Sequence, residues 1–262
     1  MTNFFSRTGG SVCLTVLISI TFLLAGCGPS QEDARNKLRE MGHSFEKKSF
    51  LKATSGGNLK AVELFLQGGM SPDVETRDGK TPLHFAAKAG RTKVAEALLD
   101  ADANVDAKTR DGSTPLHIAA WEKEAEVVKA LLDGGAETNV RRGGTTSLRG
   151  DGYSTERGQV TNFSVGGNTA LMDAAFMGGA ETVKVLIENG SDPNARTESG
   201  YTALLLAAAA SRTTPSYEEL RTDAMRALLE NGANPDVKAE GFTPLTRAAE
   251  EGDLKALEAL LD

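Results

Sequence analysis

The histidines and cysteines of this chain are the residues best suited to hold a metal or act as nucleophiles, and they are few. The 262 residues include three histidines, His43, His84 and His117, and two cysteines, Cys13 and Cys27. A zinc site needs several such ligands at short spacing, and no third or fourth ligand stands near any histidine. Both cysteines lie within the first 27 residues, away from the remaining body. The sequence therefore predicts no metal site.

Sequence motifs for catalysis or cofactor binding are also missing. The chain has no nucleophile elbow, no phosphate-binding loop and no dinucleotide fingerprint. Its 29 Lys and Arg stand against 36 Asp and Glu, a formal net charge of -7. An acidic chain lacks the surplus of cations that holds phosphate backbones. We therefore expect no enzyme, no cofactor and no nucleic-acid partner.

The amino-terminal segment has the pattern of an export signal. No residue from Thr8 to Gln31 is charged, and Arg7 precedes a continuous apolar run, VCLTVLISITFLL. That run has 13 residues, fewer than the roughly 20 that span a bilayer. It ends in Leu-Ala-Gly-Cys at Cys27, which resembles a bacterial lipobox. The alternative is a plain export signal with an incidental cysteine.

The lipobox resemblance implies a lipid anchor. It predicts a signal peptide over residues 1–26, a diacylated Cys27 and a lipidated tether over residues 27–33. Gly28 stands where lipoproteins kept in the inner membrane of enteric bacteria have Asp. The resemblance therefore implies a bacterial envelope protein, lipid-anchored in the outer membrane and facing the periplasm.

A repeated motif fills the rest of the chain. Five copies of Thr-x-Leu-x-x-Ala-Ala start at Thr81, Thr114, Thr169, Thr202 and Thr243, and the first two read TPLHFAA and TPLHIAA. Their spacings are 33, 55, 33 and 41 residues. A 33-residue period with this motif resembles the ankyrin repeat, with excesses of 22 and 8 residues as insertions.

The residue types of each unit agree with that resemblance. Threonine caps the first helix, proline is tolerated at its first position, and leucine starts its buried face. The alanine pair keeps this helix thin enough for neighbours to stack. A second amphipathic helix ends at a residue suited to a left-handed backbone, and these residues are Gly69, Asp102, Gly135, Gly190 and Gly232.

We therefore predict an all-α solenoid of about six ankyrin repeats including caps, each a helix-turn-helix plus a β-hairpin. A capping helix occupies residues 34–47, and the repeats occupy residues 48–262 with insertions near 143–167 and 211–219. The first insertion enlarges a hairpin, and the second lengthens the loop between two helices. His84 and His117 share one motif position, where the family uses the imidazole to bond the backbone and the neighbouring threonine.

The ankyrin resemblance implies protein binding on the concave side, at the hairpin tips and the first helices. Large apolar residues fall at positions that the family leaves exposed: Trp121, Phe176, Met177, Tyr201 and Phe242. Cations of repeats two and three lie on the same side: Arg77, Lys80, Lys88, Arg110, Arg141 and Arg142. Because exposed aromatic clusters mark contact sites, these residues predict a protein-binding surface with an acidic partner. The alternative is that the first insertion folds over the patch.

Several functions fit this pattern. The first is a non-enzymatic protein-binding module tethered by lipid to the envelope. More specific forms are an immunity protein that neutralises a periplasm-targeted toxin, or an accessory factor for a periplasmic enzyme in stress protection. A surface-exposed protein that contacts a host is a different class, and the sequence leaves these alternatives open.

Overall fold

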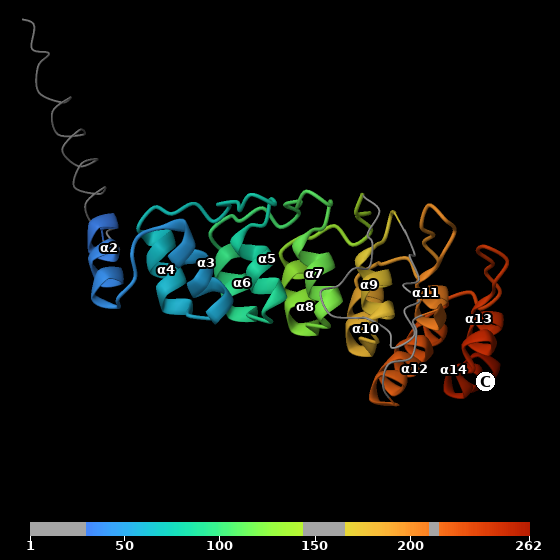
Figure 1. The fold of residues 1–262 in the computed structure, drawn as a ribbon. Coiled ribbons are helices and arrows are strands. Elements are labelled where there is room, and N and C mark those ends of the chain that lie inside the picture. The colour runs from blue at the N-terminus through green and yellow to red at the C-terminus, as the bar shows by residue number, and fades with distance from the viewer. Residues whose placement is uncertain (1–29, 144–165, 210–214) are drawn as a thin grey trace, which may run out of the picture.

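The computed structural model describes residues 30–143, 166–209 and 215–262. Within them, helix pairs stand side by side in one elongated row, and the loops that join successive pairs gather along one edge (Figure 1). The predicted signal peptide, Cys27 and most of the first insertion lie outside the described residues. No helix in the described ranges is long and apolar enough to cross a membrane.

In the described ranges, six helix pairs follow one short helix, which confirms the predicted solenoid. The leading helix is α2 (Gln31–Glu40). The first helices of the pairs are α3 (Lys47–Gly56), α5 (Pro82–Lys88), α7 (Pro115–Glu122), α9 (Ala170–Phe176), α11 (Ala203–Ala209) and α13 (Pro244–Glu251). The second helices are α4 (Leu59–Gln67), α6 (Thr92–Leu99), α8 (Ala125–Asp133), α10 (Ala180–Glu188), α12 (Pro215–Glu230) and α14 (Leu254–Leu261).

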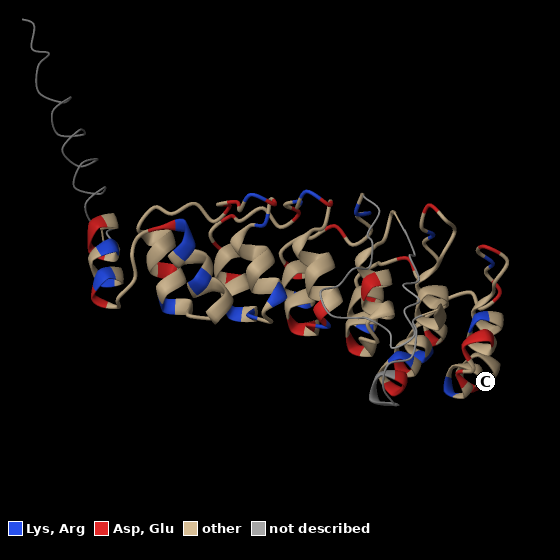
Figure 2. Cartoon of the chain, viewed as in Figure 1, with Lys and Arg blue, Asp and Glu red and all other residues tan. Residues whose placement is uncertain are grey.

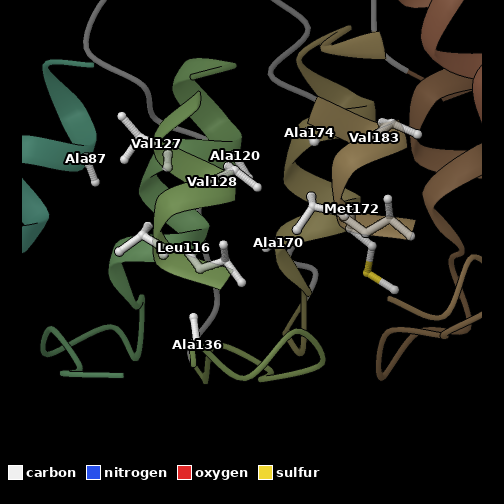
Figure 3. Packing of buried hydrophobic residues seen from close by; sticks show 14 of the residues in the cluster. Ala87, Leu116, Ala120, Val127, Val128, Ala136, Ala170, Met172, Ala174 and Val183 are labelled. Atoms are coloured by element: carbon white, nitrogen blue, oxygen red, sulfur yellow. The ribbon is translucent and has the colours of Figure 1, made fainter. Parts of the chain in front are cut away.

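The repeated motif forms the first helices as its residue types predict. Thr81, Thr114 and Thr243 are N-caps in extended conformation, and each is followed by proline in the first turn. The alanine pairs of α5 and α7 are fully buried. Figure 3 shows Ala87 and Ala120 with branched apolar side chains of neighbouring helices around them. Small side chains at this position let adjacent repeats approach closely, so the core is one continuous strip.

The left-handed turns after the second helices are confirmed. Gly69, Gly135, Gly190 and Gly232 have φ between 85° and 89°, and Asp102 has φ 60°. Glycine adopts this conformation without steric cost. Aspartate tolerates it because its short side chain bonds locally.

Helix α2 covers the amino-terminal end of the row, as predicted, with different bounds. Ser30 and Asp33 form a capping box, so the helix begins at Gln31, three residues before the predicted start. Ala34 and Leu38 are fully buried, and α2 packs against α4. Residues 31–33, predicted as tether, are therefore helical.

The second insertion differs from its prediction. Helix α12 has 16 residues, whereas α4, α6, α8, α10 and α14 have eight or nine. Residues 215–219 therefore lengthen a helix, and the prediction that they belong to a longer loop was wrong. The physical reason is Pro215, which suits the first turn of a helix.

The loops between pairs are closed by backbone hydrogen bonds. Thr76 N–H donates to the Lys80 carbonyl at 2.9 Å, and Thr109 N–H donates to the Ser113 carbonyl at 3.0 Å. Within the described ranges, the predicted β-hairpins reduce to such loops plus one isolated antiparallel bridge, between Ala239 and Phe242.

The first insertion leaves and re-enters the row through the same bonding pattern. Arg142 N–H donates to the Asn168 carbonyl, and Gly167 N–H donates to the Arg142 carbonyl, both at 3.0 Å. Its two ends are therefore adjacent, and the flanking repeats keep their register.

Candidate protein-binding site

The two motif histidines tie neighbouring repeats together. His84 Nδ1 accepts from the backbone N–H of Thr81 at 3.1 Å, so its Nε2–H donates to the carbonyl of Ser113 in the next repeat, at 3.2 Å. His117 repeats the arrangement with Thr114 and the Asn168 carbonyl, at 3.3 and 3.1 Å. Burial lowers the pKa of both imidazoles.

Both imidazoles are therefore neutral structural connectors with every nitrogen engaged. In the part of the chain that the structure describes, no group of three or more His, Cys, Asp or Glu could hold a metal.

An aromatic pair lies on the first helices of repeats three and four. The rings of Trp121, on α7, and Phe176, at the end of α9, stack with centroids 5.8 Å apart and planes 20° apart. The Arg142 guanidinium stands 5.9 Å from the Trp121 ring centroid. Trp121, Phe176 and the adjoining Met177 are half-buried. We call Trp121, Phe176 and Met177 the aromatic patch.

A second half-buried aromatic residue, Phe85, lies on α5, the first helix of the preceding repeat. Among the described residues, neither Phe85 nor Trp121 belongs to the buried core or to the half-buried side chains packed on it. Large apolar groups that contribute little to the core and keep exposed area are candidates for a partner contact.

Tyr201 does not join this patch, so its predicted exposure was wrong. Only 4% of the residue is exposed. Its hydroxyl donates to Glu240 of the next repeat at 2.8 Å. Burial, together with the bond to Glu240, raises the pKa of the Tyr201 phenol to about 12. The Tyr201 N–H donates to Thr197 Oγ1 at 3.0 Å, as the Lys80 N–H donates to Thr76 Oγ1, so the bond to Glu240 is what distinguishes Tyr201 from the exposed Lys80.

Phe242, in the last repeat, is half-buried beneath the guanidinium of Arg247, which stands 5.2 Å from the ring centroid. The structure therefore brings Trp121, Phe176 and Met177 together and gives Phe242 a cationic cover.

The predicted cations divide into two groups. Arg77, Lys88 and Arg110 are exposed, as predicted. The side chain of Lys80 is 41% exposed and pairs with Asp78 at 3.1 Å. Arg142, expected on the same exposed side, is only 8% exposed. That expectation was wrong because Arg142 pairs with a buried carboxylate.

The comparisons with known proteins agree with this geometry. A family model described as ankyrin repeats (3 copies) matches residues 49–142 and 171–262. The chain belongs to the ankyrin-repeat family. Ankyrin repeats are protein-interaction modules and are typically without catalytic activity.

Solved structures of ankyrin proteins share the fold. The human ASB11 ankyrin repeat domain aligns with TM-score 0.64 and 24% identity, over 81% of this chain and 82% of that one. The ankyrin repeat protein EF0377 aligns with TM-score 0.64 and 25% identity, over 83% of this chain and 98% of that one. A search of curated proteins found no match.

The partner of Arg142 is a buried carboxylate that the sequence reasoning missed. Arg142 Nη2 donates to Asp173 Oδ1 at 2.8 Å, and Asn168 Nδ2 donates to the same oxygen at 3.3 Å. Asp173 Oδ2 has no hydrogen-bond partner. Burial raises the pKa of Asp173, against the opposing effect of the Arg142 guanidinium. A usable signal was present, since Asp173 stands at the motif position where Phe85 and Ile118 are apolar.

A second buried ion pair joins the last two ankyrin repeats. Arg221, on α12, donates to Asp253, and both side chains are almost fully buried. Asp253 is also the N-cap of α14, where its Oδ1 accepts from the N–H of Ala256 at 3.0 Å. The pair therefore fixes α14 against α12. No pattern in the sequence predicted it.

Proposed function

We propose that this ankyrin array is a non-enzymatic protein-binding module, tethered by lipid on Cys27 to the bacterial envelope and facing the periplasm. The observation that carries the binding role is Trp121. It is the sole tryptophan of the chain, and it is half-buried on a first helix, stacked on Phe176 and outside the core. Aromatic anchors of this kind dominate the energetics of many interfaces.

The tether places a limit on where the partner acts. Three residues separate Cys27 from Gln31, where α2 begins. At full extension this chain reaches about 14 Å. The partner is therefore a protein that works close to the membrane face.

Crosslinking tests the binding role. A photo-reactive residue placed at Lys88, exposed at the end of α5 beside Phe85, would be irradiated in intact cells that make the protein. We expect one dominant protein adduct. Trp121→Ala should weaken binding by about 2 kcal/mol or more, while the melting temperature changes little because Trp121 lies outside the core.

Leu254→Ala is the matched control, because Leu254 is a large apolar residue, 73% exposed, on a second helix. It should leave the adduct unchanged. A clear fall in melting temperature for Trp121→Ala, with the adduct retained, would show that Trp121 packs inside the monomer and does not bind a partner.

The location is tested separately. Cells grown with labelled palmitate should label the wild-type protein and leave Cys27→Ser unlabelled. The protein should survive protease treatment of intact cells and be digested once the outer membrane is permeabilised. Digestion in intact cells would place the array on the outer surface instead.

A further inference from the structure

The loops of repeats two to four carry exposed cations next to the aromatic patch. Lys108 and Arg141 occupy equivalent positions, because each directly precedes the residue whose N–H closes its loop. Arg77 and Arg110 also occupy equivalent positions, because each directly follows the residue whose N–H closes its loop. All four side chains are exposed. We call Arg77, Lys108, Arg110 and Arg141 the cationic loop strip, and Figure 2 shows blue segments on these loops.

Three carboxylates of the same loops, those of Asp73, Asp106 and Asp111, accept hydrogen bonds within the array. Asp73 Oδ1 accepts from the N–H of Asn104 at 2.9 Å, and Asp106 Oδ1 accepts from the N–H of Glu137 at 3.2 Å. Asp111 accepts from the hydroxyls of Thr109 and Ser113.

Among the described residues, by contrast, Arg77, Lys108 and Arg110 form no ion pair. Their charges therefore remain available to an outside group, whereas Asp73, Asp106 and Asp111 bond within the array.

The sign of the loop tips reverses along the row. The position held by Arg77 and Arg110 in repeats two and three is held by Glu198 in repeat five and Glu240 in repeat six. All are exposed. The position after the alanine pair also changes, from Lys88 through the aromatic patch to Glu250 in the last repeat. These two rows run from cationic to anionic, and the second has apolar residues between. The position held by Lys108 and Arg141 does not reverse, because Arg196 and Lys238 hold it in repeats five and six.

We infer that the partner docks through an acidic protein segment that includes a large apolar residue. The apolar residue contacts Phe85 and Trp121, and the carboxylates lie on the cationic loop strip. The inference rests on the proposed binding function and adds the partner's chemistry and its orientation along the row. An anionic membrane or nucleic acid fits less well, because residues 166–262 carry 16 Asp and Glu against 8 Lys and Arg and would repel both.

Site-specific crosslinking tests this orientation. A photo-reactive residue replaces Lys108, in the cationic section, or Ser199, in the anionic section, and adducts are mapped to the partner segment that they join. Both positions are exposed. We expect the adduct at position 108 to join a segment with a net negative charge.

The double variant Arg77→Glu/Arg110→Glu should lower the yield at position 108 about tenfold, because charges at an interface rim govern encounter with a charged partner. Lys93→Glu/Lys129→Glu is the matched control. These exposed lysines lie on α6 and α8, the second helices of the same two repeats, and their reversal should change the yield less than twofold.

Three results would overturn the inference and leave the proposed function standing: a neutral or basic segment at position 108, protein adducts at position 199 alone, or equal yields from the charge-reversed and control variants. Binding of the purified protein to vesicles of phosphatidylglycerol and phosphatidylethanolamine that Arg77→Glu/Arg110→Glu abolishes would assign the strip to lipid. Absence of any protein adduct at positions 88, 108 and 199 would contradict the proposed function itself.

Discussion

Repeats two and three connect to their neighbours in a different way from the last repeats. His84 and His117 reach the next repeat with a neutral imidazole. Their motif position holds Met172, Leu205 and Thr246 further along the chain. There, Arg221 and Asp253 form a buried ion pair between repeats five and six, and Arg142 pairs with Asp173 within repeat four. The same stacking of helix pairs is thus stabilised by two kinds of polar contact.

The halves also differ in charge. Residues 30–143 hold 18 Lys and Arg and 18 Asp and Glu, whereas residues 166–262 hold 8 and 16. The negative charge of the chain therefore belongs to the second half. A family fold constrains helix geometry and small buried residues, and it leaves both the inter-repeat polar contacts and the surface charge free to diverge.

The largest effect is expected for a broken ion pair in the second half. Asp253→Ala removes the buried carboxylate that pairs with Arg221 and the N-cap of α14. Such losses cost about 3–5 kcal/mol. Urea unfolding with hydrogen exchange should show α14 opening first. Arg221→Met/Asp253→Ala should recover much of the loss, since paired replacement by apolar groups is often neutral. A double variant as unstable as the single one would show that the pair itself holds the repeats.

A smaller loss is expected for the neutral connector of the first half. His117→Leu leaves the N–H of Thr114 unbonded and removes one of the two bonds to the carbonyl of Asn168, at a cost of about 1–3 kcal/mol. Thermal and urea unfolding measure it. The control is Thr246→Leu, at the same motif position but exposed, which should cost much less. Equal losses at the two positions would mean that the imidazole bridge adds no stability.

The two kinds of contact should respond to pH with opposite signs. Burial lowers the pKa of His84 and His117. Their contribution to the free energy of unfolding is therefore full above about pH 6.5 and falls as the pH drops below that value. Burial raises the pKa of Asp173, so its contribution is present below about pH 3.9 and is lost as pH rises through the raised value.

Each group contributes at most about 1.4 kcal/mol per pH unit. Unfolding free energies measured from pH 4 to 8 should lose their acid slope in His84→Gln/His117→Gln, and Asp173→Asn should remove the opposing slope. Unchanged pH profiles in both variants would contradict this assignment.

The smallest effect is expected on the outer side of the last repeat. Leu254 and Leu261 are 73% and 72% exposed, so Leu254→Glu should shift the unfolding free energy by less than about 0.5 kcal/mol. Calorimetry measures it. A large loss would show that these leucines are covered in solution.

The register of the repeats was predictable from sequence because it depends on local chemistry. Threonine caps, alanine pairs and left-handed turns such as Gly69 each follow from residues close in the chain. The inward turn of Tyr201 was not predictable, because its hydroxyl bonds to Glu240, 39 residues away. The same holds for Arg142, whose exposure was judged from its loop position and is decided by Asp173, 31 residues later.

The second insertion shows a further limit of prediction from the sequence. Periodicity located the eight extra residues, but it did not decide between a longer loop and a longer helix. The outcome depended on Pro215 starting α12 early. The aromatic patch was found from motif positions alone, whereas its Arg142 neighbour required the packed structure.

The backbone bonds that close the base of the first insertion make the fold of the flanking repeats independent of the insertion's sequence. Between Thr76 and Lys80 three residues form the loop, and between Arg142 and Asn168 there are 25, yet the closing bonds are the same. For an unrestrained chain, this growth costs about 2 kcal/mol of closure entropy. Evolution can therefore rewrite, shorten or replace those residues at a nearly fixed thermodynamic cost, and a protein engineer could graft a foreign sequence at the same point.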